Sequence, residues 1–285
     1  MEKINICFCI DDKYIKHTFA TISSIIENSA KKSDIIFYII SDSISNENKQ
    51  KINNLSEKKN IIINIIEINE AYDENISLGK YGKYILYRLS IPEYINEDKI
   101  LYLDSDMIIL GKIEELWKKN ISNYIVGVIQ QDKPKNFPLD IKYFNSGLLL
   151  INAVLWKKEN IKSKVLNYLS QNNHFGWPDQ DALNMVIKGN CLFLDKSWNT
   201  LNFYSTSKVN LFHFAGLKPW RIESLNPYNL EYYKYLSMTM DLSTKDKKIY
   251  LWNKFLKIIP LSIKIFIDKY IYLNLYYIKE YFLKK

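Results

Sequence analysis

The chain has 285 residues, of which 47% are hydrophobic and 25% are charged. These fractions predict a folded globular protein with one large domain, or one domain and an appendage, and they exclude a disordered chain. The three cysteines lack the even number and spacing of a disulfide framework, which indicates a reducing compartment. The eight glycines form neither GxGxxG nor a GxxxxGKS/T motif, so the two commonest phosphate-binding loops are excluded.

The net charge of +8 is concentrated at the C-terminal end of the chain. Residues 245–285 contain ten lysines and three acidic residues, a net charge of +7, whereas the rest of the chain carries 29 basic and 28 acidic side chains. Arginine occurs only twice, at Arg88 and Arg221. Proteins that read nucleic acids usually use arginine on base edges and phosphates, so we expect no nucleic-acid partner.

The sequence contains no recognisable targeting signal or membrane-spanning segment. The apolar stretch near the first residue is too short for a signal peptide and is followed at once by two aspartates. In the C-terminal region, lysines interrupt every apolar run before it reaches the ~18 residues that a spanning helix needs. We therefore expect a cytoplasmic protein.

Strand-like and helix-like segments alternate along the chain. Apolar and β-branched runs predict strands at residues 4–10, 35–40, 61–66, 99–103, 107–110, 124–129 and 144–151. Helical spacing predicts helices at residues 14–28, 46–55 and 178–187, and Asn152 is expected to cap a further helix. This alternation predicts an α/β fold with a mostly parallel central sheet. The composition changes near residues 239–248, so we expect one domain over residues 1–244 and a basic, aromatic tail over residues 245–285.

The most informative segment is KILYLDSDMIIL, in which Asp104 and Asp106 lie between two apolar runs. In an extended chain these two side chains point the same way, with their Cα atoms roughly 6–7 Å apart. Two carboxylates beside a core repel each other unless one is protonated or a cation lies between them. A hard divalent ion such as Mg²⁺ or Mn²⁺ would resolve this repulsion. The alternative is an acidic surface turn, because a bare DxD is common.

A second acidic pair, Asp11 and Asp12, follows the first predicted strand. Open α/β sheets bind ligands at the carboxyl ends of their strands, so both acidic segments are candidates for one site. The alternative for the second pair is a solvated start of a helix, where the helix dipole favours acidic residues.

Six segments, in this order, resemble glycosyltransferase family eight, the retaining group that contains glycogenin and bacterial lipooligosaccharide galactosyl- and glucosyltransferases. Together they span most of residues 1–220 and read IDDKYIKHTFATISSI (10–25), YILYRLSIPEYI (84–95), ILYLDSDMII (100–109), YFNSGLLLIN (143–152), WPDQDALN (177–184) and HFAGLKPW (213–220). The resemblance implies a single GT-A type nucleotide-binding domain. It also implies transfer of galactose or glucose from UDP-galactose or UDP-glucose to a saccharide acceptor.

The resemblance implies that the uridine binds at the end of the first strand. Asp11 would accept a hydrogen bond from the uracil edge, the backbone near Cys9 would pair with it, and Tyr14 would stack on the ring. Ser105 and Gly216 are also expected to contact the donor. The alternative for Tyr14 is a core aromatic at the start of a helix.

The family's metal site implies that Asp104, Asp106 and His213 bind Mn²⁺, with Mg²⁺ as the second choice, because mixed imidazole and carboxylate ligands suit Mn²⁺ better. Lys218 resembles the family's lysine that faces the diphosphate. Arg88 would lie over the phosphate and sugar, and its apolar surroundings require an anion or carboxylate as partner. The remaining histidines, at positions 17 and 174, are expected on a helix surface and in a loop.

Three further positions would line the sugar by the same resemblance: Asn145, Asp179 and Gln180. Asp179 would accept hydrogen bonds from sugar hydroxyls, and Gln180 would lie near the anomeric carbon. Together with Lys218, these two are the candidate catalytic residues. The reaction passes through an oxocarbenium-like state, and a neutral glutamine favours same-face internal return over a covalent intermediate. The alternative for Asp179 is an acid that stabilises the start of a helix after Pro178.

The basic tail mixes tyrosine, tryptophan and other apolar residues with lysines. These residue types favour membrane interfaces and anionic lipids. We expect a peripheral protein on the inner face of the cytoplasmic membrane, acting on a lipid-linked acceptor of lipopolysaccharide or lipooligosaccharide type. The alternative is a helix pair that packs on the catalytic domain with solvated lysines.

Other functions predict different sequence features. A glycosyltransferase acting on a protein or another glycan would share the donor site, and the acceptor is left open. A basic membrane-binding module without catalysis would need no organised body. A sugar nucleotidyltransferase would share the sheet and the acidic metal site, but it would need a glycine-rich loop, which the sequence lacks.

Overall fold

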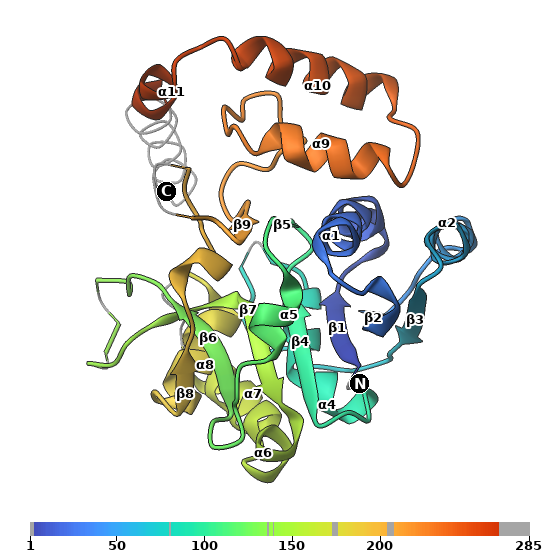
Figure 1. Cartoon of the computed structure of the whole chain (residues 1–285). Coiled ribbons are helices and arrows are strands. Elements are labelled where there is room, and N and C mark those ends of the chain that lie inside the picture. Colours follow the sequence, from blue (N-terminus) through green and yellow to red (C-terminus); the bar gives the residue numbers. More distant parts are fainter. Residues whose placement is uncertain are drawn as a thin grey trace.

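A computed structural model of the chain describes residues 3–79, 81–135, 137–138, 140–172, 176–203 and 208–267. Its centre is a seven-stranded sheet with helices on both faces, and the last helices form a separate layer above α1 (Figure 1). The predicted α/β fold with a mostly parallel central sheet is confirmed. No helix in these described ranges is long and apolar enough to cross a membrane.

The central sheet has the strand order β3-β2-β1-β4-β7-β6-β8. Four of its neighbouring pairs are parallel, and only β7 runs antiparallel to both of its neighbours. A two-stranded antiparallel sheet, β5 with β9, was not expected from the sequence. The bounds are β1 Ile4–Cys9, β2 Ile35–Ser41, β3 Ile62–Glu67, β4 Lys99–Leu103, β5 Met107–Ile109, β6 Val126–Gln130, β7 Phe144–Asn152, β8 Cys191–Phe193 and β9 Leu211–His213.

Each predicted helix is present, and several short helices are added between the strands. The helices are α1 Ile15–Asn28, α2 Asn46–Lys59, α3 Tyr84–Tyr87, α4 Ile91–Tyr94, α5 Ile113–Trp117, α6 Ala153–Lys158, α7 Ile161–Gln171, α8 Pro178–Ile187, α9 Asn229–Ser237, α10 Thr244–Leu256 and α11 Leu261–Ile267. The α2 helix is longer than predicted, because it continues past residue 55 to Lys59. Asn60, in the left-handed conformation, ends it. Asn152 caps α6 as expected, accepting a hydrogen bond from Leu155 N.

The two faces of the sheet bury two separate apolar cores. Alternate residues of β1 illustrate the division: Ile6 and Phe8 face the core shared with α1 and α2, and Cys7 and Cys9 face the core shared with α6, α7 and α8. Strands buried on both faces need apolar side chains at nearly every position, as in the runs that predicted them.

Strand order and register bring distant segments to one edge of the sheet. Parallel neighbours β1 and β4 end side by side, so the residues after Cys9 lie beside those after Leu103. In the small sheet Met107 pairs with His213, which carries the end of β9 to the DSD segment. Phe214 N then donates to Asp106 O at 2.9 Å, and Asp104 N donates to Gly147 O at 2.8 Å.

The C-terminal helices α9 and α10 form a layer that packs on the rest of the chain. The α10 helix starts with a capping box of Ser243 and Asp246, and its buried Ile249 joins a core with α9. Asp246 also pairs with Lys16 of α1 at 2.5 Å. The described part of the predicted tail therefore packs partly on the domain, and residues 268–285 lie outside the described residues.

Candidate active site

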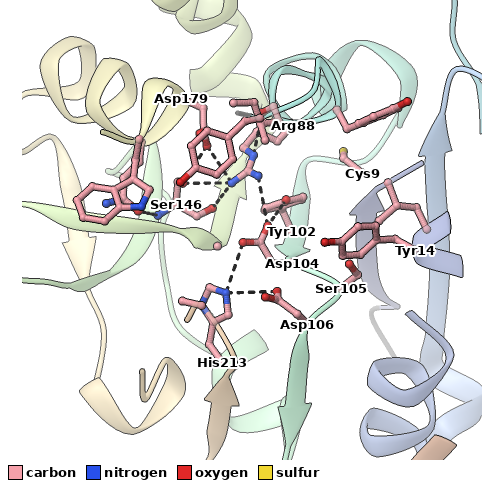
Figure 2. Close-up of a pocket in the computed structure, with 18 of the residues that line it drawn as sticks. Cys9, Tyr14, Arg88, Tyr102, Asp104, Ser105, Asp106, Ser146, Asp179 and His213 are labelled. Atoms are coloured by element: carbon pink, nitrogen blue, oxygen red, sulfur yellow. Dashed lines mark hydrogen bonds and ion pairs between the residues drawn. The ribbon is translucent and has the colours of Figure 1, made fainter. Parts of the chain in front are cut away.

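A cavity of about 430 Å³ opens at the carboxyl ends of β1 and β4 (Figure 2). All but one of the residues proposed from the sequence for the site line it: Cys9, Asp11, Tyr14, Arg88, Asp104, Ser105, Asp106, Asn145, Asp179, Gln180, His213 and Lys218. The exception is Gly216, which is exposed and lies outside the lining, between Ala215 and Lys218, which belong to it. Both acidic segments thus reach one cavity, as the strand-end argument predicts.

Two carboxylates and one imidazole meet in this cavity. Asp104 follows β4, Asp106 precedes β5, and His213 ends β9, and each offers a ligand atom within 4.8 Å of the others. His213 Nε2 lies 3.6 Å from Asp104 Oδ2 and 3.3 Å from Asp106 Oδ1 (Figure 2). Oxygen and imidazole nitrogen donors converging from three separate segments fit Mn²⁺ or Mg²⁺.

Lys218 lies on the Asp106 side of this group. Its Nζ donates to Asp106 Oδ2 and, at 2.8 Å, to Phe214 O. Burial alone would raise the pKa of Asp106, but the charges of Lys218 and His213 outweigh it and hold that pKa well below its usual range. Asp106 is therefore a carboxylate across the physiological range, as a metal ligand must be.

Arg88 is buried on the other side of Asp104, where its positive charge compensates the carboxylates of Asp179 and Asp104. Its Nη1 lies 3.1 Å from Asp179 Oδ2 and its Nη2 lies 3.3 Å from Asp104 Oδ1. Further N–H groups donate to Ser146 O at 2.9 Å and to Ile85 O at 3.0 Å, and the guanidinium carbon lies 4.7 Å from the centre of the Tyr102 ring. The sequence-based expectation that Arg88 faces a carboxylate is confirmed. Burial raises the pKa of Asp179, and Arg88 opposes that rise.

The first turn of α8 carries Asp179 and Gln180 into the cavity. Asn184, one turn later, fixes the helix to β7, because its Oδ1 accepts from Phe144 N at 2.9 Å and its Nδ2 donates to Phe144 O at 2.9 Å. Asp179 also accepts from Ser146 Oγ at 2.9 Å. Both residues are buried, and so is Asn145 on the facing strand.

The opposite end of the cavity is formed by the loop after β1. Asp11 accepts from Tyr14 N at 3.0 Å and caps a short 3₁₀ helix, while the Tyr14 ring is 36% exposed and lines the cavity. This exposure is inconsistent with the core alternative for Tyr14. Asp12 points elsewhere, accepting from Ser45 N at 2.9 Å and so supporting the start of α2.

The sequence predicted that His17 lies on an open helix surface, but in the structure it does not. Its ring stacks on Trp220, with centroids 3.5 Å apart, and its Nδ1 lies 2.6 Å from Tyr232 OH. Burial, with Lys16 nearby, lowers the pKa of His17 to about 3. This contact fastens the segment that carries Lys218 to α1. The histidine at position 174 lies outside the described residues.

Several lining residues were missed by the sequence analysis. Ser146 and Gly147 belong to a segment quoted for the family resemblance, so that segment could have indicated them. Tyr102 and Trp177 also lie within quoted segments and line the cavity. Asn199 contacts His213 from a segment that no quoted motif covers, so the sequence contained no signal for it.

Comparisons with known proteins show which family and which relatives the chain resembles. The family model described as "Glycosyl transferase family 8" matches residues 5–224. General stress protein A of Bacillus subtilis (strain 168) is 28% identical over 270 residues, which cover 84% of this chain and 94% of that protein. The lipopolysaccharide 1,2-glucosyltransferase of Escherichia coli (strain K12) is 27% identical over 262 residues, 82% of this chain and 77% of that protein.

A solved structure has the same fold. The galactosyltransferase LgtC, crystallised with donor and acceptor sugar analogs, superposes with a TM-score of 0.74 at 20% identity. The match covers 86% of this chain and 100% of that chain. The fold is that of GT-A type enzymes, and because the family model covers most of the sequence, the chain belongs to glycosyl transferase family 8.

Proposed function

We propose that the protein is a retaining, metal-dependent enzyme that moves galactose or glucose from a UDP-sugar to a saccharide acceptor. The observation that carries this proposal is the meeting of Asp104, Asp106 and His213 with Lys218 in one cavity. A leaving diphosphate needs positive charge, and the chain has no glycine-rich loop to bind it. A metal ion and Lys218 are the groups that can supply that charge.

The proposed donor spans the cavity from the end of β1 to the start of α8. Its uracil would stack on the half-exposed Tyr14 ring and pair with Asp11 and the backbone near Cys9. Its sugar would lie against Asp179 and Gln180. We assign the remaining donor contacts to Arg88, Ser105 and Asn145, which line the cavity.

Asp104, Asp106 and His213 would hold Mn²⁺, or Mg²⁺ as the second choice, and the bound ion would supply Lewis-acid neutralisation of the leaving diphosphate. Lys218 would bring a second positive charge to the same oxygens. Its bond to Phe214 O keeps the ammonium group on this side of the cavity. Arg88 would hold Asp179 and Asp104 at fixed positions through its paired contacts.

Retention without a covalent intermediate is supported by the bonds of Gln180. Its Oε1 accepts from Asn145 Nδ2 at 3.0 Å and from Ser146 N at 3.1 Å, so both lone pairs of the oxygen are used. Its Nε2 donates to Tyr143 OH at 2.9 Å. An amide oxygen bound in this way is a poor nucleophile. We therefore favour internal return, in which the acceptor attacks the face that the diphosphate leaves.

The metal-dependent reaction can be tested by replacing one proposed ligand. We expect Asp106→Asn to lower UDP release from UDP-glucose or UDP-galactose with Mn²⁺ at least about 100-fold, because a weakened site loses several kcal/mol of charge stabilisation. The readout is UDP release from a panel of UDP-sugars, with and without a chelator. Asp195→Asn is the control, since Asp195 only caps a 3₁₀ helix and asparagine keeps that cap.

Unchanged turnover in Asp106→Asn would contradict the proposed role of the metal site. Absence of UDP binding in calorimetry with Mn²⁺ present would contradict the proposed donor. The same panel also separates glucose from galactose.

The proposed acceptor is a lipid-linked saccharide of lipopolysaccharide or lipooligosaccharide type. The name of the E. coli relative supports this assignment. Trp177, which is 43% exposed at the cavity, adds an aromatic surface that suits a sugar ring. A protein or another glycan as acceptor is the alternative within the same chemistry.

We also propose that α10 and α11 bind the anionic inner face of the cytoplasmic membrane. Five of the six lysines between residues 244 and 267 are exposed, and the one acid in this range, Asp246, is paired with Lys16. Lysines near anionic lipid contribute about 1 kcal/mol each, and aromatic residues favour the interface. The two helices and the turn between them expose large apolar side chains, namely Leu251, Trp252, Phe255, Ile258, Leu261, Ile263 and Phe266.

This membrane proposal predicts the behaviour of a surface variant. We expect Trp252→Ser with Phe255→Ser to reduce cosedimentation with phosphatidylglycerol vesicles at least about tenfold, because two exposed aromatic side chains are lost from the interface. Binding to phosphatidylcholine vesicles should be weak for both proteins. The control is Val154→Ser, an exposed apolar residue on α6. Equal sedimentation of the double variant and the control would contradict the proposal.

A further inference from the structure

A chain of buried amide side chains connects His213 with the start of α8. His213 Nδ1 lies 3.0 Å from Asn199 Oδ1, and Asn199 Nδ2 donates to Asn145 Oδ1 at 2.8 Å. Asn145 Nδ2 then donates to Gln180 Oε1 at 3.0 Å. All four residues are at most 8% exposed, so each contact is made inside the protein and not through bulk water.

Two backbone N–H groups of β7 determine which way these amides point. Gly147 N lies 2.9 Å from Asn145 Oδ1, and Ser146 N lies 3.1 Å from Gln180 Oε1. A backbone N–H can only donate, so the amide atom that faces each one must be the oxygen. The Asn145 side chain therefore accepts through Oδ1 and donates through Nδ2.

The same rule continues from Asn145 to the imidazole. Because Asn145 presents an oxygen to Asn199, the Asn199 atom beside it must be the donor Nδ2. The other Asn199 atom, which faces His213, is then an oxygen that only accepts. His213 Nδ1 must therefore carry a proton, which leaves Nε2 as the nitrogen that a metal ion can bind. Nε2 is the atom that faces Asp104 and Asp106.

We propose that Asn199 is a positioning residue that keeps a proton on His213 Nδ1 and so leaves Nε2 as the nitrogen able to bind a metal ion, and that β7 sets this orientation through Asn145. A histidine ligand binds with one unprotonated nitrogen and usually donates its other N–H to a fixed partner. Here that partner is a neutral amide, so the ring is oriented without a further negative charge beside the two carboxylates. The proposal rests on the proposed metal site, but it concerns a property of the metal-free protein.

The tautomer can be measured directly in metal-free, ¹⁵N-labelled full-length protein. The chain has only three histidines, so long-range ¹H–¹⁵N correlation spectra are simple to assign with His213→Gln as the reference. We expect the wild-type His213 signals to show a protonated Nδ1. An unprotonated Nδ1 in the wild type would overturn the proposal.

Two substitutions separate the role of Asn199 from its contribution to packing. Asn199→Leu keeps the size but offers no acceptor, so we expect a mixture of tautomers and Mn²⁺ affinity weakened about 10–100-fold in calorimetry. Asn199→Asp keeps an acceptor for Nδ1–H, so we expect the wild-type tautomer. The matched control is Asn210→Leu, because Asn210 is similarly buried and bonds to Ser197 rather than to His213.

The outcomes decide whether Asn199 positions His213. Unchanged protonation of His213 Nδ1 and unchanged Mn²⁺ affinity in Asn199→Leu would overturn that role, as would equal losses of Mn²⁺ affinity in Asn199→Leu and Asn210→Leu. If Asn199→Leu does not fold, the wild-type and Asn199→Asp spectra still decide. A wild-type protein with the expected proton on His213 Nδ1 but no Mn²⁺-dependent UDP binding would contradict the proposed function and leave the proposed role of Asn199 intact.

Discussion

Replacing Gly147 by alanine is expected to abolish metal-dependent transfer while the protein still folds. A Cβ atom at this position would lie 2.6 Å from His213 Cε1, 2.7 Å from Asp104 Oδ2 and 2.9 Å from Asn145 Oδ1. Real Cβ contacts are not this short, so at least one of these side chains, two of which are proposed metal ligands, must move. Ligands displaced by even a fraction of an ångström cannot keep the geometry that a divalent ion requires.

The expected magnitude for Gly147→Ala is a loss of at least about 100-fold in Mn²⁺ affinity and in UDP release. Overpacking of this kind should lower the free energy of unfolding by only about 1–3 kcal/mol. Electron paramagnetic resonance titration with Mn²⁺ measures the first effect, and urea denaturation measures the second.

Gly127→Ala is the matched control for this prediction. Gly127 lies in β6 of the same sheet, and a Cβ there would lie 3.2 Å from Leu194 Cδ1 and 3.3 Å from Leu150 Cβ. These apolar neighbours can shift slightly, and none of them belongs to the group of Asp104, Asp106 and His213. Equal Mn²⁺ affinity in the two variants would show that Gly147 is not needed for space beside the ligands.

Much of the fold could be predicted because local signals and tertiary packing agree. The strand Lys99–Leu103 and the helix Pro178–Ile187 have the bounds expected from the sequence. The helix begins with proline at its first turn and ends at Lys188, which is left-handed and is followed by glycine. The strand at β5 was predicted, but its pairing with β9 was missed because β9 has only three residues, too few to show a period.

The candidate site was predictable where a residue type alone implies its chemistry. Two aspartates beside a core repel each other unless one is protonated or a cation lies between them, and a buried arginine needs an anion, so Asp104, Asp106 and Arg88 could be singled out as candidates. The contact of Asn199 with His213 and the stack of His17 on Trp220 could not be predicted in this way. Each joins segments far apart in the sequence, and an asparagine or a histidine is equally at home in many other surroundings.

Replacing Arg88 by methionine is expected to cause a large loss of stability. Arg88 is 5% exposed and lies between the carboxylates of Asp179 and Asp104. Removal of one partner from a buried ion pair leaves uncompensated charge and typically costs about 3–5 kcal/mol. Since 1 kcal/mol shifts the unfolding temperature of a domain this large by about 2–4 °C, the expected decrease is roughly 10 °C.

The chain's other arginine provides the control. Arg221 lies at the surface, where its side chain is 60% exposed and its Nε is 3.4 Å from Glu223. We expect Arg221→Met to change the free energy of unfolding by at most about 0.5 kcal/mol, since exposed pairs contribute little. Similar unfolding temperatures for the two variants would contradict the view that Arg88 compensates buried charge.

A double substitution tests the cause of the loss in Arg88→Met. If uncompensated charge is responsible, adding Asp179→Asn should restore part of the stability, because it removes one of the two carboxylates that have lost their partner. A double-mutant cycle from urea denaturation should then give a coupling free energy of about 1–3 kcal/mol between the two positions. Additive effects would mean that lost packing, and not charge, explains the instability. The cycle can be run on metal-free protein, so its result is independent of whether the chain binds a UDP-sugar.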